Sequence, residues 1–139
     1  MADRILGPVD CLAVEFPRGV VEAAALERLD QLGSDGTIDV LDLEFISKDS
    51  DGSVRKVGLD EIEYAGDVDI AAWAGASSGL LDDSDVAQIG ASITAGSLAG
   101  ILVYENVWAL PLLATLDQGE GRVVGWQRIA SDDLQAAVG

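Results

Sequence analysis

The feature that most constrains the fold is a pattern that occurs twice: a strand-like run, then a helical run, then a second strand-like run. The first copy passes from LAVEFP (residues 12–17) through a helix ending in LDQ (29–31). The second passes from ILVYEN (101–106) through a helix ending in the same LDQ (116–118). Two such units are typical of a ferredoxin-like split β-α-β sheet, whose right-handed crossovers place both helices on one face.

Hydrophobic periodicity supplies the remaining elements. Alternating or continuous apolar runs predict strands at 9–16, 37–48, 53–58, 98–106 and 122–129, with a further short strand at 68–73. Helical spacing predicts helices at 18–32, 82–93 and 107–118, and a short terminal helix over 131–138 with Ser131 as its cap. In 37–48, Leu41, Leu43 and Phe45 share one face, whereas Ile38 and Val40 are in the opposite phase.

These elements predict one α+β domain over residues 1–139. Its first β-α-β half covers 7–48, and a hairpin, a glycine-rich connection and a helix are inserted at 49–96. The second half and a short C-terminal helix cover 97–139. The open face or an edge strand of such a sheet is a common pairing surface, so we expect a homo-oligomer.

The charge balance excludes several partners. Asp and Glu number 25 against 8 Lys and Arg, a net charge of −17, and Lys56 to Arg122 contains no basic residue between its ends. Binding to nucleic acid or to an anionic membrane surface needs clustered basic residues, and neither is expected. The acidic surface serves solubility, reflects habitat or codon bias, or meets a basic protein partner.

The chain has no histidine and one cysteine, Cys11. Histidine-based nucleophile systems and most transition-metal sites are therefore absent, and no intramolecular disulfide can form. Cys11 lies in a strand-like run, where a buried, inert thiol is expected. We expect a non-catalytic protein without cofactors. Because no secretory signal is visible, we expect it in the cytoplasm.

The acidic cluster Asp82, Asp83 and Asp85 follows the glycine-serine run GASSG (75–79). These carboxylates could hold a hard cation, but the start of a helix favours their role in capping amide groups. GASSG lacks the lysine of a phosphate-binding loop. Similarly, SKDSDGS (47–53) resembles half of a calcium loop, but position twelve falls on Gly58, and a hairpin turn fits better.

Two further patterns leave alternatives open. Residues 86–104 carry no charge over 19 positions, yet their polar residues and change of period favour a helix, a turn and a strand over a membrane span. Trp73, Trp108 and Trp126 could line an apolar ligand pocket, or they anchor a core or an interface.

Several motifs together carry a family resemblance: Gly7-Pro8-Val9-Asp10, KDSDGSV, GASSGLLDDSD, Gly96-Ser97 and YENVWA. From about Gly7 to Leu134 the chain resembles an uncharacterised bacterial domain-of-unknown-function family of short acidic proteins. It is also similar to a larger unknown-function family labelled as predicted membrane proteins, although the hydrophobic insert of that family is not present as a clear span. The resemblance implies a small soluble, stress-associated protein that acts by association and supplies no catalytic residues.

The leading functional hypothesis is accordingly an acidic protein-interaction or self-assembly module. The alternative is a small-molecule-binding protein with a tryptophan-lined pocket over the sheet.

Overall fold

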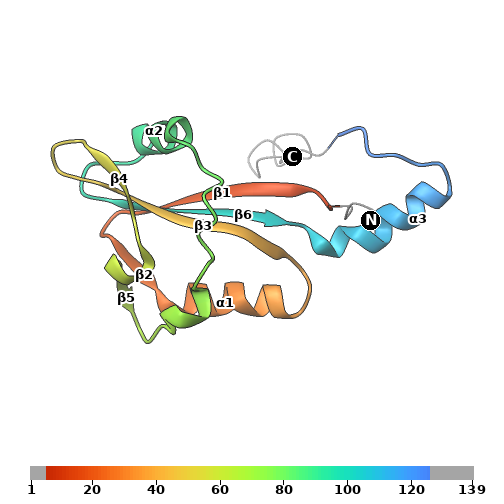
Figure 1. Ribbon diagram of the computed structural model, residues 1–139, viewed down its shortest axis with the longest axis horizontal. Helices are drawn as coiled ribbons and strands as arrows, with labels where there is room; N and C mark the ends of the chain where they lie inside the picture. The colour runs from red at the N-terminus through yellow and green to blue at the C-terminus, as the bar shows by residue number, and fades with distance from the viewer. Residues whose placement is uncertain (1–5, 126–139) are drawn as a thin grey trace, which may run out of the picture.

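The computed structural model describes residues 6–125, which form a mixed α+β fold around a four-stranded antiparallel sheet of order β1-β6-β3-β4 (Figure 1). A second, parallel sheet has the two short strands β2 and β5. The elements, where η marks a short 3-10 helix, are β1 (Val9–Phe16), β2 (Val20–Glu22), α1 (Ala23–Ser34), β3 (Asp39–Lys48), β4 (Val54–Val57), η1 (Leu59–Glu61), β5 (Glu63–Ala65), η2 (Ile70–Trp73), α2 (Asp83–Ala91), β6 (Leu98–Glu105), η3 (Val107–Ala109) and α3 (Leu110–Gln118).

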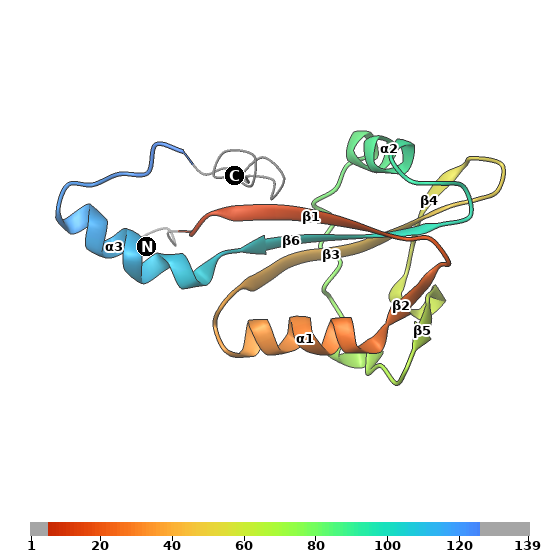
Figure 2. The same cartoon turned by 180° about the vertical axis from the view of Figure 1, so that it is seen from behind.

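The two helices next to the sheet lie on opposite faces of it. Figures 1 and 2 show α1 on one side and α2 on the other, while α3 extends beyond the end of β6. No residue of α3 is buried, so the expectation that helix 107–118 covers the sheet beside the first helix is wrong. The α+β class is confirmed, whereas the ferredoxin-like topology is not.

Strand register explains how one sheet serves two cores. Residues directly opposite each other in a sheet share a face. The row Leu12–Leu102–Leu43 faces α1, and the row Ala13–Ile101–Glu44 faces α2. The α1 core contains Val21, Leu26, Leu43, Phe45 and Leu98, and the α2 core contains Ile46, Leu81, Ile93, Ala99 and Ile101.

A β-bulge between Val40 and Asp42 corrects the predicted phase of β3. The extra residue, Leu41, shifts the alternation by one position. Val40 therefore packs against the same core as Leu43 and Phe45 instead of facing the opposite side.

Other elements differ from the prediction where contacts between distant segments determine the secondary structure. The first turn of the helix predicted over 18–32 is strand β2, which pairs with β5, and the strand predicted at 68–73 contains the 3-10 helix η2. Residues 121–125 form no strand, and the rest of the predicted strand 122–129 lies outside the described residues, as does the helix predicted over 131–138.

The uncharged stretch 86–104 divides as predicted into the end of α2, a turn and β6. Gly96 takes a positive φ of 83° in the turn. A Cβ atom on Gly100 would lie 2.9 Å from a ring carbon of Phe45, so the glycine makes room for that ring in the α1 core. Among residues 6–125, no helix has the length and apolarity needed to cross a membrane.

Candidate functional site

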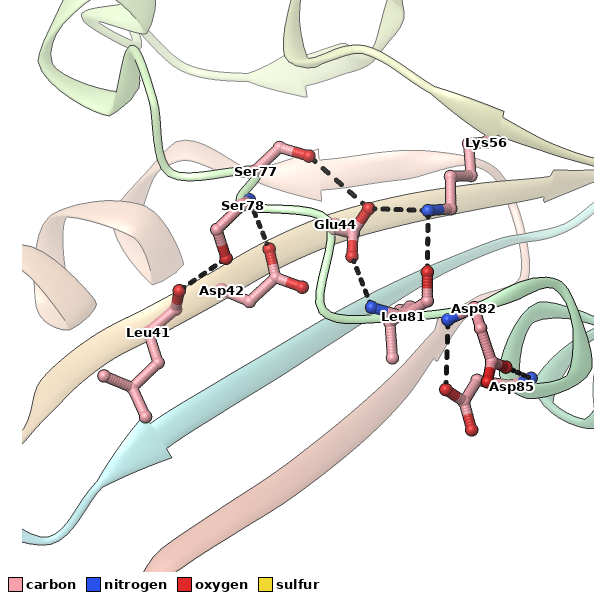
Figure 3. Close-up of polar contacts among 9 residues, drawn as sticks. All are labelled: Leu41, Asp42, Glu44, Lys56, Ser77, Ser78, Leu81, Asp82 and Asp85. Carbon is pink, nitrogen blue, oxygen red and sulfur yellow. Dashed lines mark hydrogen bonds and ion pairs between the residues drawn. The ribbon is translucent and has the colours of Figure 1, made fainter. Parts of the chain in front are cut away.

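The candidate site is built where one strand edge is left open. β4 pairs with β3 only from Phe45 to Lys48, so the preceding part of β3 lacks a neighbouring strand on that side. Residues 76–81, which we call the strap, run along this opening (Figure 3). The Leu43 amide donates to the Ala76 carbonyl over 2.9 Å, and Ser78 Oγ donates to the Leu41 carbonyl over 2.7 Å.

Two carboxylates of β3, Asp42 and Glu44, are buried beneath the strap, with 1% and 5% of their surfaces exposed. The Ser78 amide donates to Asp42 Oδ1 over 2.7 Å, and the Leu81 amide donates to Glu44 Oε2 over 3.3 Å (Figure 3). Buried carboxylates need such donors because an unpaired charge in a poorly solvated place is costly. These contacts hold the strap against β3.

Lys56 of β4 completes the site. Its ammonium nitrogen lies 3.1 Å from Glu44 Oε1 and donates to the Leu81 carbonyl over 3.1 Å. One cation thus links β4, β3 and the strap. Ser77 Oγ donates to the same Glu44 oxygen over 3.4 Å.

The two carboxyls have pKa values shifted in opposite directions. Burial raises the pKa of Glu44, the neighbouring Asp42 raises it further, and Lys56 opposes the rise. Burial alone would raise the pKa of Asp42, but hydrogen bonds from Glu44 and Ser78 outweigh it and lower that pKa. Asp42 Oδ2 is buried and has no hydrogen-bond donor with both carboxyls ionised. Of the two carboxyls, Glu44 is therefore the one that takes up a proton first as pH falls.

A pocket of about 490 Å³ adjoins this site between β3, β4 and the loops that follow β4. Its lining includes the apolar side chains of Phe45, Leu59, Ile70 and Trp73, together with Glu44 and Lys56. Small-molecule sites of this size combine apolar walls with a few polar groups. The arrangement could therefore accept a small ligand with an apolar body.

The three candidate tryptophans are not gathered in one place. Trp73 lies in η2, packs against the α1 core and lines the pocket. Trp108 lies in η3, half exposed, where its Nε1 donates to Asn106 Oδ1 over 3.1 Å, and it does not line this pocket. Trp126 lies outside the described residues.

The aspartates at the end of the strap form a helix cap. Asp82 Oδ1 accepts the Asp85 amide over 2.8 Å, and Asp85 Oδ2 accepts the Asp82 amide over 3.1 Å. This reciprocal pair caps α2, and Asp83 occupies its first turn. Within residues 6–125 no group of three or more His, Cys, Asp or Glu side chains is placed to hold a metal ion.

The motif SKDSDGS forms a turn. Residues 49–53 make the predicted hairpin turn, in which Ser53 Oγ donates to Asp49 and Asp51.

Cys11 is exposed on β1, because β1 is an edge strand. The prediction of a buried thiol is therefore wrong. Partial burial, Asp85 and Asp42 raise the pKa of the Cys11 thiol, which keeps it protonated.

Sequence reasoning missed Asp42, Glu44 and Lys56. The alternation of acidic and apolar residues in DVLDLEF is typical of a strand with one face in water, so it gives no sign that the acids are buried. The available signal was GASSG itself, because small polar residues and glycine bring backbone amides close to carboxylates.

The chain belongs to a family of unknown function, DUF6325, whose profile matches residues 5–138. This confirms the expected membership of an unknown-function family over nearly the whole chain. No curated protein and no solved structure matches the chain.

Proposed function

We propose that this family member is a non-catalytic module that assembles with copies of itself through the outer edge of β1, which pairs with no further strand among residues 6–125. The observation that carries the proposal is the surface of this strand, where Val9, Leu12 and Val14 have 44%, 40% and 41% of their surfaces exposed. β1 is an edge strand, and such edges offer unpaired backbone groups to a further strand. A cytoplasmic location and a stress-associated role remain expectations from the sequence.

The test is the mass of the full chain in solution. Size-exclusion chromatography with light scattering, run from micromolar to millimolar protein, should show an oligomer whose fraction grows with concentration. A strict monomer over the whole range would contradict the proposal.

Two leucine-to-lysine variants, one on β1 and one on α3, test where the copies contact each other. Leu12→Lys should raise the dissociation constant about tenfold or more, because two like charges would face each other across the new pairing. Leu116→Lys is the matched control, since Leu116 is 47% exposed on α3. Loss of assembly with the control alone would move the contact to α3.

The pocket beside Trp73 supports a second candidate function, the binding of a small apolar molecule. The supporting observation is a volume of about 490 Å³ together with an ion pair at its lining between the buried Glu44 and the exposed Lys56. Nile red, a neutral apolar dye, should gain fluorescence with the wild-type chain and lose the gain in Ala71→Phe, which fills the pocket. Ala114→Phe on α3 should behave as wild type, and an equal gain in all three proteins would reject the site.

A further inference from the structure

The two edges of the main sheet are built differently. β4 has four residues, and its centre carries two charges, Arg55 and Lys56. β1 has eight residues, and its centre, Cys11 to Val14, is uncharged. Charged, short strands are the usual protection of a sheet edge against pairing. Among the described residues, β1 is thus the long edge that lacks this protection.

We propose that β1 pairs with β1 of a second copy, antiparallel and centred on Leu12, to make one continuous eight-stranded sheet. The inference rests on the proposed function and specifies its partner and register. The two-fold axis stands perpendicular to the sheet, since this is the symmetry that places two identical strands antiparallel in one sheet.

Charge placement on β1 favours a second copy as the partner. Asp10 lies in the phase of Leu12, on the α1 face, and Glu15 lies in the phase of Ala13, on the α2 face. The perpendicular two-fold axis keeps each face on its own side, so a residue meets only residues of its own phase. Asp10 therefore never lies opposite Glu15 of the other copy.

An acidic residue could meet its own copy only in registers centred on Asp10 or on Glu15, near the strand ends, where few residues overlap. Both acids are also held by their own chain. Asp10 accepts a hydrogen bond from Asn106 over 2.9 Å, and Glu15 accepts the Thr94 amide over 2.8 Å. Although the chain has a net charge of −17, its β1 can therefore pair with β1 of a second copy without placing two acidic residues opposite each other.

Two central registers give the greatest overlap, and the side chains favour the one centred on Leu12. This register places Leu12 against its own copy and Cys11 against Ala13, and it sets Asp10 opposite Val14 and Glu15 opposite Val9. A pairing centred on Ala13 would instead place Asp10 against Phe16, whose ring already packs in the α1 core.

The pairing also brings a groove of each copy close to the contact between the two β1 strands. A groove of about 430 Å³ lies between β1 and α2, with Cys11, Glu15 and Asp85 in its lining. Because the axis keeps the faces, both copies of α2 lie on the same side of the eight-stranded sheet. The two grooves then lie on either side of the contact between the two β1 strands.

Disulfide trapping of the full chain tests the register. In Ala13→Cys, mild oxidation should join Cys11 of one copy to the introduced thiol of the other, identified as a linked peptide by mass spectrometry. The double variant Cys11→Ser/Ala13→Cys should not cross-link. Leu80→Cys, which adds an exposed thiol on the strap, controls for collision between exposed thiols and should give little dimer.

The outcomes separate this inference from the proposed function. A cross-link in the double variant would overturn the Leu12 register in favour of one centred on Ala13. An oligomer in solution without any cross-link in Ala13→Cys would overturn β1 pairing and leave self-assembly standing. A wild-type monomer at all concentrations would overturn both.

Discussion

At the scale of single residues, Asp42 is the carboxylate whose replacement should lower the free energy of unfolding most. Asp42→Ala leaves the Ser78 amide without its acceptor beneath the strap, which should cost about 1–3 kcal/mol of unfolding free energy. Asp42→Asn keeps an acceptor for Ser78 and offers a donor to Glu44, so it should cost less. Urea unfolding at neutral pH measures both, with Asp67→Ala as an exposed control. Equal losses in Asp42→Ala and Asp67→Ala would contradict the role of Asp42 in holding the strap.

Glu44 should make stability depend on pH. Its pKa is raised above the ordinary 4.5, so the folded state holds the proton more tightly than the unfolded state. The stabilisation is complete below 4.5 and is lost as pH rises through the raised value. Glu44→Gln removes this loss, so its unfolding free energy relative to wild type should rise with pH over that interval. Unfolding curves for the two proteins at a series of pH values measure this difference, and a difference that stays constant with pH would contradict the raised pKa of Glu44.

At the scale of elements, the cap of α2 distinguishes two interpretations of the aspartate cluster. Asp82→Ala removes the acceptor for the Asp85 amide and should cost about 0.5–2 kcal/mol. Asp83→Ala removes only an interaction with the helix dipole and should cost less, about 0.3–1 kcal/mol. Chemical unfolding followed by circular dichroism compares the two. If added Mg²⁺ or Ca²⁺ stabilised the wild type and neither variant, the capping interpretation would be insufficient.

The elements also show what sequence can and cannot predict. β1, β3, β6, the hairpin and the cap follow from local signals: alternation, a turn motif and carboxylates before a helix. β2 could not be predicted, because its three residues become a strand only by pairing with β5. The burial of Asp42 and Glu44 could not be predicted either, because a segment more than thirty positions further along the chain covers them.

At the scale of the whole molecule, the proposed pairing of β1 with a second copy must overcome the net charge of the two chains. Two chains of −17 repel each other, and dissolved salt screens that repulsion. Raising ionic strength from about 0.01 M to about 1 M shortens the Debye length from about 30 Å to about 3 Å, so association should become tighter. Salt does not screen the apolar contacts between the two β1 strands. At high salt these contacts should therefore be the main contribution to association.

Analytical ultracentrifugation across this salt range measures the dissociation constant. Leu12→Lys separates the two effects, because it lowers the net charge of each chain yet places like charges together at the contact between the two β1 strands. It should therefore associate more weakly than wild type at every salt concentration. If salt weakened wild-type association, ion pairs between copies would be holding the assembly, and the acidic surface rather than the uncharged centre of β1 would be the contact.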